Sequence, residues 1–127
     1  MKVLLRIVAA ALAVFFVSTA IAQYPARPIR LIIPIPPGGA PDIAARVVGQ
    51  KLAEQLGQPV VFDNRPGSNG NIAADLTAKS PPDGYTVGLL ADSMVTINPH
   101  IYAKMPVDTL KDLVPLASIA ANQFVLS

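Results

Sequence analysis

The sequence contains no cysteine and only one histidine among its 127 residues. Because zinc sites in proteins are built mainly from cysteine and histidine, these two shortages argue against a zinc site. The lack of cysteine also excludes a lipid anchor attached to a cysteine behind an export signal. His100 stands in an Asn-Pro-His segment typical of a turn, where a packing role is the simpler interpretation. We therefore predict no metal and no cofactor.

Motifs for nucleotide binding and catalysis are absent as well. Neither GxxxxGK[ST] nor GxGxxG occurs in the sequence, so a nucleotide-binding fingerprint is missing. There is no G-x-S-x-G elbow, and the eight acidic residues are scattered along the chain. These absences argue against an enzyme. A hydrolase that uses a glycine loop as an oxyanion site is a remaining alternative, which a panel of ester substrates would test.

Excess positive charge is confined to the N-terminus. Lys2 and Arg6 precede an apolar run over residues 7–17, and Ala20-Ile21-Ala22 matches an A-x-A cleavage site. This pattern predicts a secretory signal peptide at residues 1–22, with a membrane anchor as the alternative. Its removal leaves 105 of the 127 residues and lowers the formal charge from +2 to zero. A neutral chain gives no indication of nucleic-acid or acidic-lipid binding.

Strand-like and helix-like segments alternate through the rest of the chain, residues 23–127. Apolar runs predict strands, and two segments have helical spacing of apolar residues. Short connections between them favour right-handed parallel crossovers. We therefore predict an α/β fold with a mostly parallel sheet and flanking helices. The predicted strands are Ile29–Ile35, Val60–Phe62, Tyr85–Leu90 and Val114–Ala121, with another starting at Gln123, and the predicted helices are Pro41 to about Leu56 and Ile72–Lys79.

The two helices carry expected buried faces, and three shorter segments have weaker signals. Residues 91–96 are expected to form a loop or short helix, residues 98–100 a turn, and residues 110–113 one helical turn. For the longer helix the spacing predicts a buried stripe of Ala45, Val48, Leu52 and Leu56. For the second helix the expected inner residues are Ile72, Ala73 and Leu76.

The junction between the first strand and the first helix is the main candidate site. Prolines 36 and 37 end the strand, Gly38 and Gly39 allow a tight loop, and Pro41 suits the start of a helix. A helix start presents free backbone N–H groups and the positive end of the helix dipole, which together attract anions. The alternative is that the glycines only make the turn. The candidate ligand-binding residues here are Pro37, Gly38, Gly39, Ala40 and Asp42.

Three more candidates follow later predicted strands, where α/β proteins place ligand contacts. Asn71 stands at the start of the second helix, and Asp92 and Ser93 follow the third strand. Each has a structural alternative, because Asn69 or Asn71 could cap a helix and Asp92 could cap a short one. Asp42 is likewise favourable in a first helical turn through the dipole alone. If the two helix starts converge, a small anion held by backbone N–H groups is their simplest use.

Six segments in register resemble the Bug family of periplasmic solute-binding proteins, the receptors of tripartite tricarboxylate transporters. The resemblance covers essentially the whole chain after the predicted signal peptide. The segments are Tyr24-Pro-Ala-Arg-Pro-Ile, Pro34-Ile-Pro-Pro-Gly-Gly-Ala-Pro-Asp-Ile, Gly57-Gln-Pro-Val-Val, Asn64-Arg-Pro-Gly, Asp83-Gly-Tyr and Ile97-Asn-Pro-His-Ile-Tyr.

The resemblance implies a two-lobed type II periplasmic binding fold, of which residues 23–127 would be the N-terminal portion of the first lobe. It also implies a monomeric, periplasmic receptor without enzymatic activity. Such a receptor holds a small organic acid or amino acid between its lobes and delivers it to membrane permease subunits. A truncated, nonfunctional remnant is the alternative. A reading frame that continues for about 170–200 codons would discriminate between the two, since a second lobe needs that length.

Two departures from the family pattern bear on the ligand. Pro41 stands where the family commonly has threonine or serine, so one hydroxyl is lost. Ala91-Asp92-Ser93 replaces a loop that is rich in glycine, threonine and serine in many members. An added carboxylate would repel a polyanion such as citrate and favour a ligand carrying an ammonium or hydroxyl group.

Overall fold

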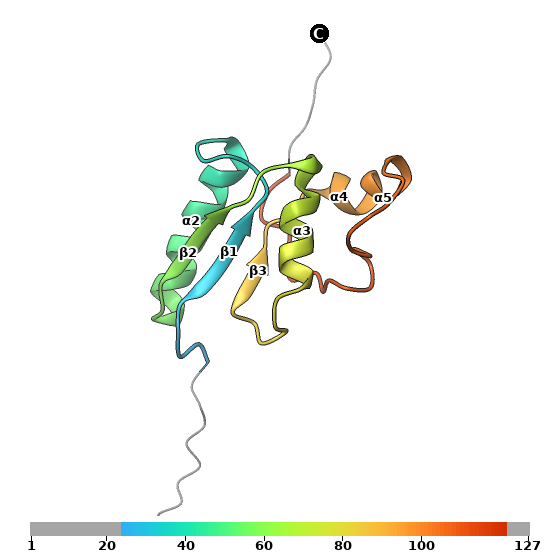
Figure 1. The fold of residues 1–127 in the computed structure, drawn as a ribbon. Coiled ribbons are helices and arrows are strands. Elements are labelled where there is room, and N and C mark those ends of the chain that lie inside the picture. Colours follow the sequence, from blue (N-terminus) through green and yellow to red (C-terminus); the bar gives the residue numbers. More distant parts are fainter. Residues whose placement is uncertain (1–23, 122–127) are drawn as a thin grey trace, which may run out of the picture.

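A computed structural model describes residues 24–121, which form a three-stranded parallel sheet with helices on both faces (Figure 1). The sheet has the order β2-β1-β3. This confirms the predicted α/β fold, while the predicted signal peptide lies outside the described residues. The elements in chain order are β1 (Ile29–Ile33), α2 (Ala40–Leu56), β2 (Val60–Asn64), the 3-10 helix η1 (Ser68–Gly70), α3 (Asn71–Ala78), β3 (Thr86–Gly88), α4 (Asp92–Thr96) and α5 (Asn98–Ile101).

The ends of α2 follow the sequence signals. Gly39 precedes the helix with an extended backbone, and Pro41 lies in the first turn, where its missing N–H costs nothing. At the other end Gly57 adopts a left-handed conformation with φ of 67°, and its N–H donates to the Ala53 carbonyl oxygen. Glycine takes this backbone conformation without steric cost, so it ends the helix cleanly.

The helices α2 and α3 cover opposite faces of the sheet. Leu31 of β1 pairs with Phe62 of β2, and the next residue, Ile32, pairs with Gly88 of β3. Successive strand residues point to opposite faces, so Phe62 and Gly88 face opposite sides. Phe62 packs against α2 at Gly49, and Gly88 packs against Thr77 of α3. Central strand β1 is therefore covered on both sides, which explains why its isoleucines are buried.

The buried face of α2 differs from the predicted stripe. Ala45 is buried as expected, but Val48 and Leu52 are 40% and 36% exposed, and Asp42 and Gly49 are buried in their place. The reason is a close approach at Gly49, where an added Cβ would lie 2.7 Å from the Phe62 ring. Only glycine permits that approach. The helix face with Ala45 and Gly49 therefore lies against the sheet, and the larger apolar side chains of Val48 and Leu52 turn partly outward.

The face of α3 is also rotated from the prediction. Ala73 is buried as expected, but Ile72 is exposed and Ala74 is buried. Small alanines allow α3 to lie close to the sheet, as Thr77 does against Gly88. In both helices, the spacing of apolar residues predicted that the larger side chains would be buried. In the structure the helices pack closely on the sheet, and the smaller side chains are the buried ones.

The predictions for the last part of the chain are wrong in detail. Residues 98–100 belong to the short helix α5 rather than to a turn. The predicted helical turn begins earlier, because the N–H groups of Lys111 and Asp112 both donate to the Asp108 carbonyl. The segment 114–121 forms no strand, since no strand in the described part pairs with it, and Val114 is 83% exposed. The strand expected from Gln123 lies outside the described residues.

A cluster of side chains fixes the segment that leads into β1. The Tyr24 hydroxyl donates to the Gly84 carbonyl at 2.7 Å, and the Ala26 N–H donates to the Tyr85 hydroxyl oxygen at 2.8 Å. The Arg27 guanidinium lies 4.2 Å from the centre of the Tyr85 ring. These contacts join the start of the described chain to the turn before β3, at the amino end of the strands. In the part described, no helix combines the length and apolar character needed to cross a membrane.

Candidate functional site

The loops that follow the three strands lie at one edge of the sheet. The strands are parallel, so their carboxyl ends share that edge, where α2 and α3 begin and where α4 follows β3 (Figure 1). The chain leaves β1 toward one face and β2 toward the other, which opens a crevice at this edge in sheets of this order. We name these three loops the carboxyl-edge loops: residues 34–39 after β1, residues 65–70 after β2 and residues 89–91 after β3. All eight predicted ligand-binding residues lie on these loops or in the first turns of the helices that follow them.

The first carboxyl-edge loop is held from inside by Asp42. The Asp42 side chain is 2% exposed and accepts a hydrogen bond from the Gly38 N–H at 2.9 Å. The Asn64 side-chain amide donates both to Asp42 Oδ1 and to the Ile35 carbonyl, each at 2.9 Å. Arg46 completes the network with two hydrogen bonds to the same carboxylate, at 2.9 and 3.1 Å. The Asp42 carboxylate therefore faces the protein interior and fixes the loop.

The backbone of the same loop is open at Gly38. Gly38 has φ of 91°, and nothing lies within 4 Å of the place where its Cβ would be. Gly39 precedes α2 without any side chain capping the helix. Uncapped first-turn N–H groups beside open space suit a carboxylate or another anion. The ligand role of Pro37, Gly38, Gly39 and Ala40 stays a prediction, and Asp42 supports the loop that carries them.

The hydrogen bonds to Asp42 lower its pKa strongly. The largest cause is the hydrogen bonding from Arg46, followed by that from Asn64 and from the Gly38 N–H. Elsewhere Arg30 lowers the pKa of Asp63, and Lys111 lowers the pKa of Asp108. In each case a donor or a positive charge favours the ionised carboxylate.

These shifts predict a loss of stability in acid. The folded pKa of Asp42 lies below its ordinary value of 3.8, so between the two values the unfolded state binds more protons than the native state. The stabilisation is therefore complete above about pH 4 and is lost as the pH falls through the folded pKa. Urea unfolding at a series of pH values between about pH 2 and pH 7 measures this change in the free energy of unfolding.

An Asp42→Asn variant shows how much of the stability lost in acid is due to Asp42. We expect it to be less stable at neutral pH and to lose less stability on acidification, with a residual slope from Asp63 and Asp108. Asp83→Asn is the matched control, because Asp83 is an exposed residue paired only with Arg27 among the described side chains. An unchanged acid slope in Asp42→Asn would contradict the assignment.

The second carboxyl-edge loop has an unusual backbone. Four consecutive residues have positive φ: Gly67 at 130°, Ser68 at 47°, Asn69 at 49° and Gly70 at 85°. Left-handed conformations are unfavourable for Ser and only tolerated by Asn, so the surroundings must hold this turn in place. Neither Asn69 nor Asn71 caps α3, because Gly70 is the capping residue and no side chain bonds to the helix start.

Both asparagines bond to Asn98 instead. The predicted site residue Asn71 is 4% exposed, and its side-chain oxygen accepts a hydrogen bond from Asn98 at 2.7 Å. Asn71 therefore supports the start of α3 from within, much as Asp42 supports the start of α2.

The third carboxyl-edge loop leads into α4. Asp92 is exposed, and its Oδ1 accepts a hydrogen bond from the Ser93 N–H at 2.8 Å. Ser93 itself is half-buried. Met94 packs against Gly70, so close that a Cβ on Gly70 would lie 1.9 Å from the methionine methyl group. Through this contact the third loop and the start of α4 adjoin the second loop.

Sequence reasoning missed three residues that support these loops. Asn64 is the last residue of β2, and the rule that strand ends carry site residues would have found it. Arg46 stands four residues after Asp42, a spacing that predicts an ion pair on a helix. Asn98 had no such signal, because it contacts residues 27 and 29 positions away in the sequence.

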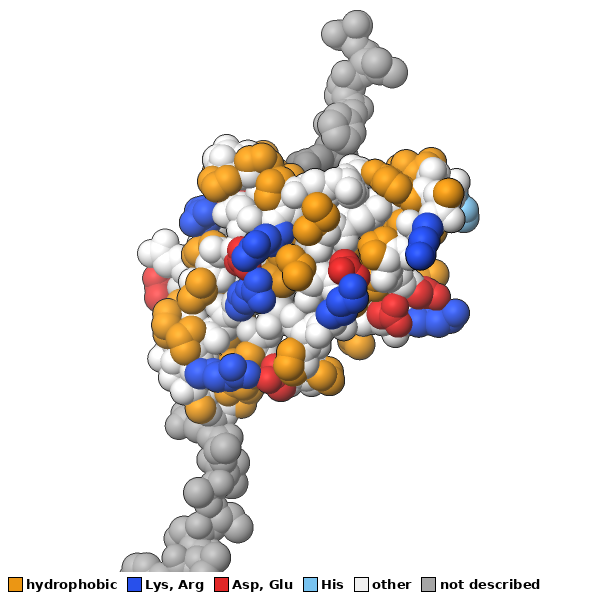
Figure 2. All heavy atoms as spheres, in the orientation of Figure 1, with side chains coloured by type: hydrophobic (Ala, Val, Ile, Leu, Met, Phe, Trp, Pro, Cys, Tyr) orange, Lys and Arg blue, Asp and Glu red, His pale blue; other side chains and the backbone are white. Residues whose placement is uncertain are grey.

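Charges of both signs lie next to one another on the surface. In Figure 2 basic and acidic side chains appear in neighbouring positions rather than in separate regions. The ion pairs Arg27–Asp83, Lys79–Asp75 and that of Asp63 with Arg30 and Arg65 account for this. Such balanced pairs give no strong field of one sign that would attract a polyanion such as nucleic acid. Among the described residues no group of three or more histidine, aspartate or glutamate side chains could hold a metal ion.

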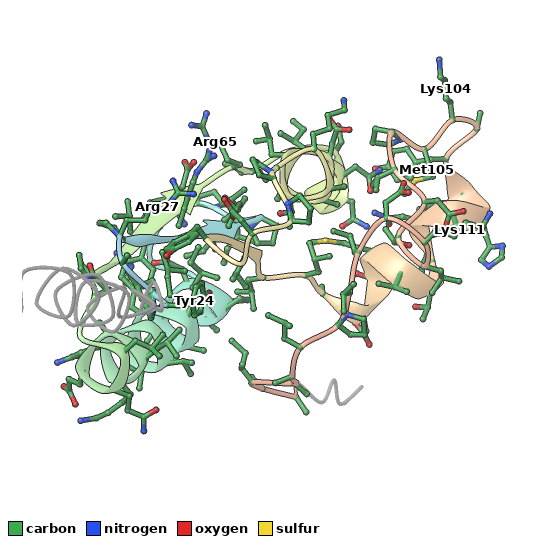
Figure 3. All side chains as sticks on the ribbon, turned by 90° about the horizontal axis from the view of Figure 1, so that it is seen from below. Tyr24, Arg27, Arg65, Lys104, Met105 and Lys111 are labelled. Atoms are coloured by element: carbon green, nitrogen blue, oxygen red, sulfur yellow. The ribbon has the colours of Figure 1, made fainter. Side chains whose placement is uncertain are left out.

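Two hollows lie near α3 and α5. One of about 300 Å³ lies between α3 and the segment after α5, and the other, of about 380 Å³, lies between Pro99 and residues 105–112. Figure 3 shows Lys104, Met105 and Lys111 together on this side, far from Tyr24, Arg27 and Arg65. The first hollow shares Ser68 and Asn71 with the site. Neither hollow is lined by the first carboxyl-edge loop, so the prediction of a site at that loop rests on its backbone geometry and not on a closed pocket.

The chain is similar in sequence to proteins of one known family. The model of the tripartite tricarboxylate transporter family receptor matches residues 44–127. The protein BugT of Bordetella pertussis is 45% identical over 104 residues, which are 81% of this chain and 32% of BugT. This chain therefore spans about one third of the length of that relative.

Two solved structures share the fold. One, described as a periplasmic transporter, is 42% identical with a TM-score of 0.67, covering 69% of this chain and 30% of its own. The other, the R. palustris protein Rpa4515 with adipate, is 39% identical with a TM-score of 0.66, covering 68% of this chain and 29% of its own. Both likenesses concern only the part of those proteins that corresponds to this chain.

Proposed function

Because this chain belongs to the tripartite tricarboxylate transporter receptor family, whose members are receptors rather than enzymes, we propose that it contributes to an extracytoplasmic receptor for small organic acids. The carboxyl-edge loops would supply one side of the ligand cleft. We further propose export through the predicted signal peptide, function as a monomer, and transfer of the ligand to membrane permease subunits.

The observation that carries the proposal is the first carboxyl-edge loop. It combines an open glycine backbone, an uncapped helix start and a buried network that fixes both. A loop that is already rigid can bind a carboxylate through its backbone donors without losing conformational entropy on binding. The adipate in Rpa4515 indicates that a related protein accepts a ligand with two carboxylates.

Unfolding experiments with added ligand test the proposal. Adipate, malate, citrate and glutamate are suitable probes, because they differ in charge number and in hydroxyl or ammonium groups. A ligand at ten times its Kd should stabilise the native state by about 1.4 kcal/mol. Stabilisation by at least one acid, but not by its uncharged amide analogue, supports the proposal. If a well-folded protein shows no stabilisation by any of them, the proposed ligand class is wrong.

Asp92 should disfavour the most highly charged ligands. Two unit charges about 4 Å apart in water interact by about 1 kcal/mol, so Asp92→Asn should strengthen citrate binding roughly fivefold if citrate approaches that closely. Asp83→Asn removes the same charge at the opposite edge of the sheet, before β3, and should leave citrate binding unchanged. Titration calorimetry on both variants measures the difference, and an equal effect in the two would contradict a local role for Asp92.

A further inference from the structure

Asn98 is a fully buried polar side chain that lies 27 positions after the predicted site residue Asn71. It is the first residue of α5 and is 0% exposed. Its Nδ2 donates to the Asn71 side-chain oxygen at 2.7 Å and to the Asn69 carbonyl at 3.1 Å. Its Oδ1 accepts a hydrogen bond from the Asn69 side-chain amide at 2.6 Å. Every one of these partners belongs to the second carboxyl-edge loop or to the first residue of α3.

These bonds explain how the second loop keeps its unusual backbone. Asn69 is bound through both its carbonyl and its side chain, in the middle of the stretch with positive φ. Asn71 is bound on the other side of Gly70, where the chain turns into α3. Asn98 therefore holds the loop at two points, on either side of the residue that precedes the helix.

A second contact joins the same two parts of the chain. Met94 of α4, only 4% exposed, packs directly on Gly70. The helices α4 and α5 are consecutive and follow the third carboxyl-edge loop. The polar contact through Asn98 and the apolar contact through Met94 thus attach the segment after β3 to the loop after β2.

We propose that Asn98 is a positioning residue for the ligand site, because it fastens the second carboxyl-edge loop to the α4–α5 segment and so holds the second and third loops as one unit. Asn98 does not itself reach the open edge, since its side chain is enclosed and its hydrogen-bonding groups face Asn69 and Asn71. It acts through the backbone that it fixes. The ligand part of this inference rests on the proposed function, whereas the effect on the loop does not.

Amide hydrogen exchange in the whole chain tests the loop directly. The Gly70 N–H donates to the Gly67 carbonyl at 2.9 Å, so its exchange rate reports whether the turn is closed. We expect Asn98→Ala to speed exchange at Gly70 at least tenfold more than exchange at the amides of β1. Asn98→Asp, which keeps the acceptor and loses the donor, should show the same selective effect. His100→Ala, an exposed change on the same short helix, is the matched control.

The comparison with β1 separates positioning from general stability. If Asn98→Ala speeds exchange at Gly70 and in β1 by the same factor, Asn98 only stabilises the fold and the inference is wrong. An unchanged Gly70 rate would overturn it as well. Adipate is the ligand probe: where the parent protein binds it, Asn98→Asp should weaken binding at least tenfold and His100→Ala should not. A parent protein that fails to bind any tested acid counts against the proposed function, while the exchange result still decides the role of Asn98.

Discussion

Gly70→Ala is expected to destabilise the protein by roughly 2–5 kcal/mol, through backbone strain and overpacking together. Gly70 has φ of 85°, a conformation that alanine adopts only with strain. The added Cβ would also lie 1.9 Å from the methyl group of Met94 and 2.6 Å from its sulfur. Met94 is buried, only 4% exposed. Urea unfolding measures the loss, and the start of α3 should be displaced in the variant.

Gly57→Ala is the matched control for this prediction. Gly57 has φ of 67°, but nothing lies within 4 Å of its Cβ position. This variant has the backbone strain without the collision, so we expect a loss of about 1–2 kcal/mol. Equal losses in the two variants would mean that the contact between Met94 and Gly70 does not hold the second loop.

Ile32→Ala is expected to cost about 2–5 kcal/mol, because it removes a large side chain from the centre of the core. Ile32 is 0% exposed and lies in the middle strand, between β2 and β3. A domain of this size is commonly stable by only about 5–15 kcal/mol, so the loss can abolish a sharp unfolding transition. Circular dichroism during urea unfolding measures both the midpoint and the sharpness.

Val61→Ala provides the comparison for Ile32→Ala. Val61 lies in edge strand β2 and is 51% exposed, so its truncation should cost less than about 1 kcal/mol. Ile32→Val, which removes a single methyl group, should cost roughly 0.5–1.5 kcal/mol. Similar losses for Ile32→Ala and Val61→Ala would contradict a core organised on both faces of β1.

The order of the main elements followed from local signals. The limits of α2 could be predicted because Gly39, Pro41 and Gly57 act on the residues next to them. The face that α2 buries could not, since it depends on the approach of Gly49 to the Phe62 ring across the sheet. The segment 114–121 alternates like a strand, but a strand also needs a neighbour to pair with, and pairing is not a property of the segment itself.

The candidate site shows the same division between local signals and distant partners. The chemistry of one strand–helix junction predicts a ligand role for Pro37, Gly38, Gly39 and Ala40, which stays a prediction, and the structure leaves open space at Gly38. The sequence did not indicate that Asp42 and Asn71 turn inward, because that depends on partners distant in the sequence, Asn64 and Asn98. Backbone donors can be predicted locally, whereas the side chains that hold them come from elsewhere in the fold.

Titration of the ¹⁵N-labelled protein with adipate, followed by amide chemical shifts, tests most directly the claim that these loops bind an organic acid. The method detects weak binding, which suits a chain that spans about one third of a relative's length. We predict saturable shifts at Gly38, Gly39 and Ala40. Shifts confined to the hollow lined by Tyr102 and Lys104, or no shifts at adipate concentrations well above the millimolar range, would contradict the account.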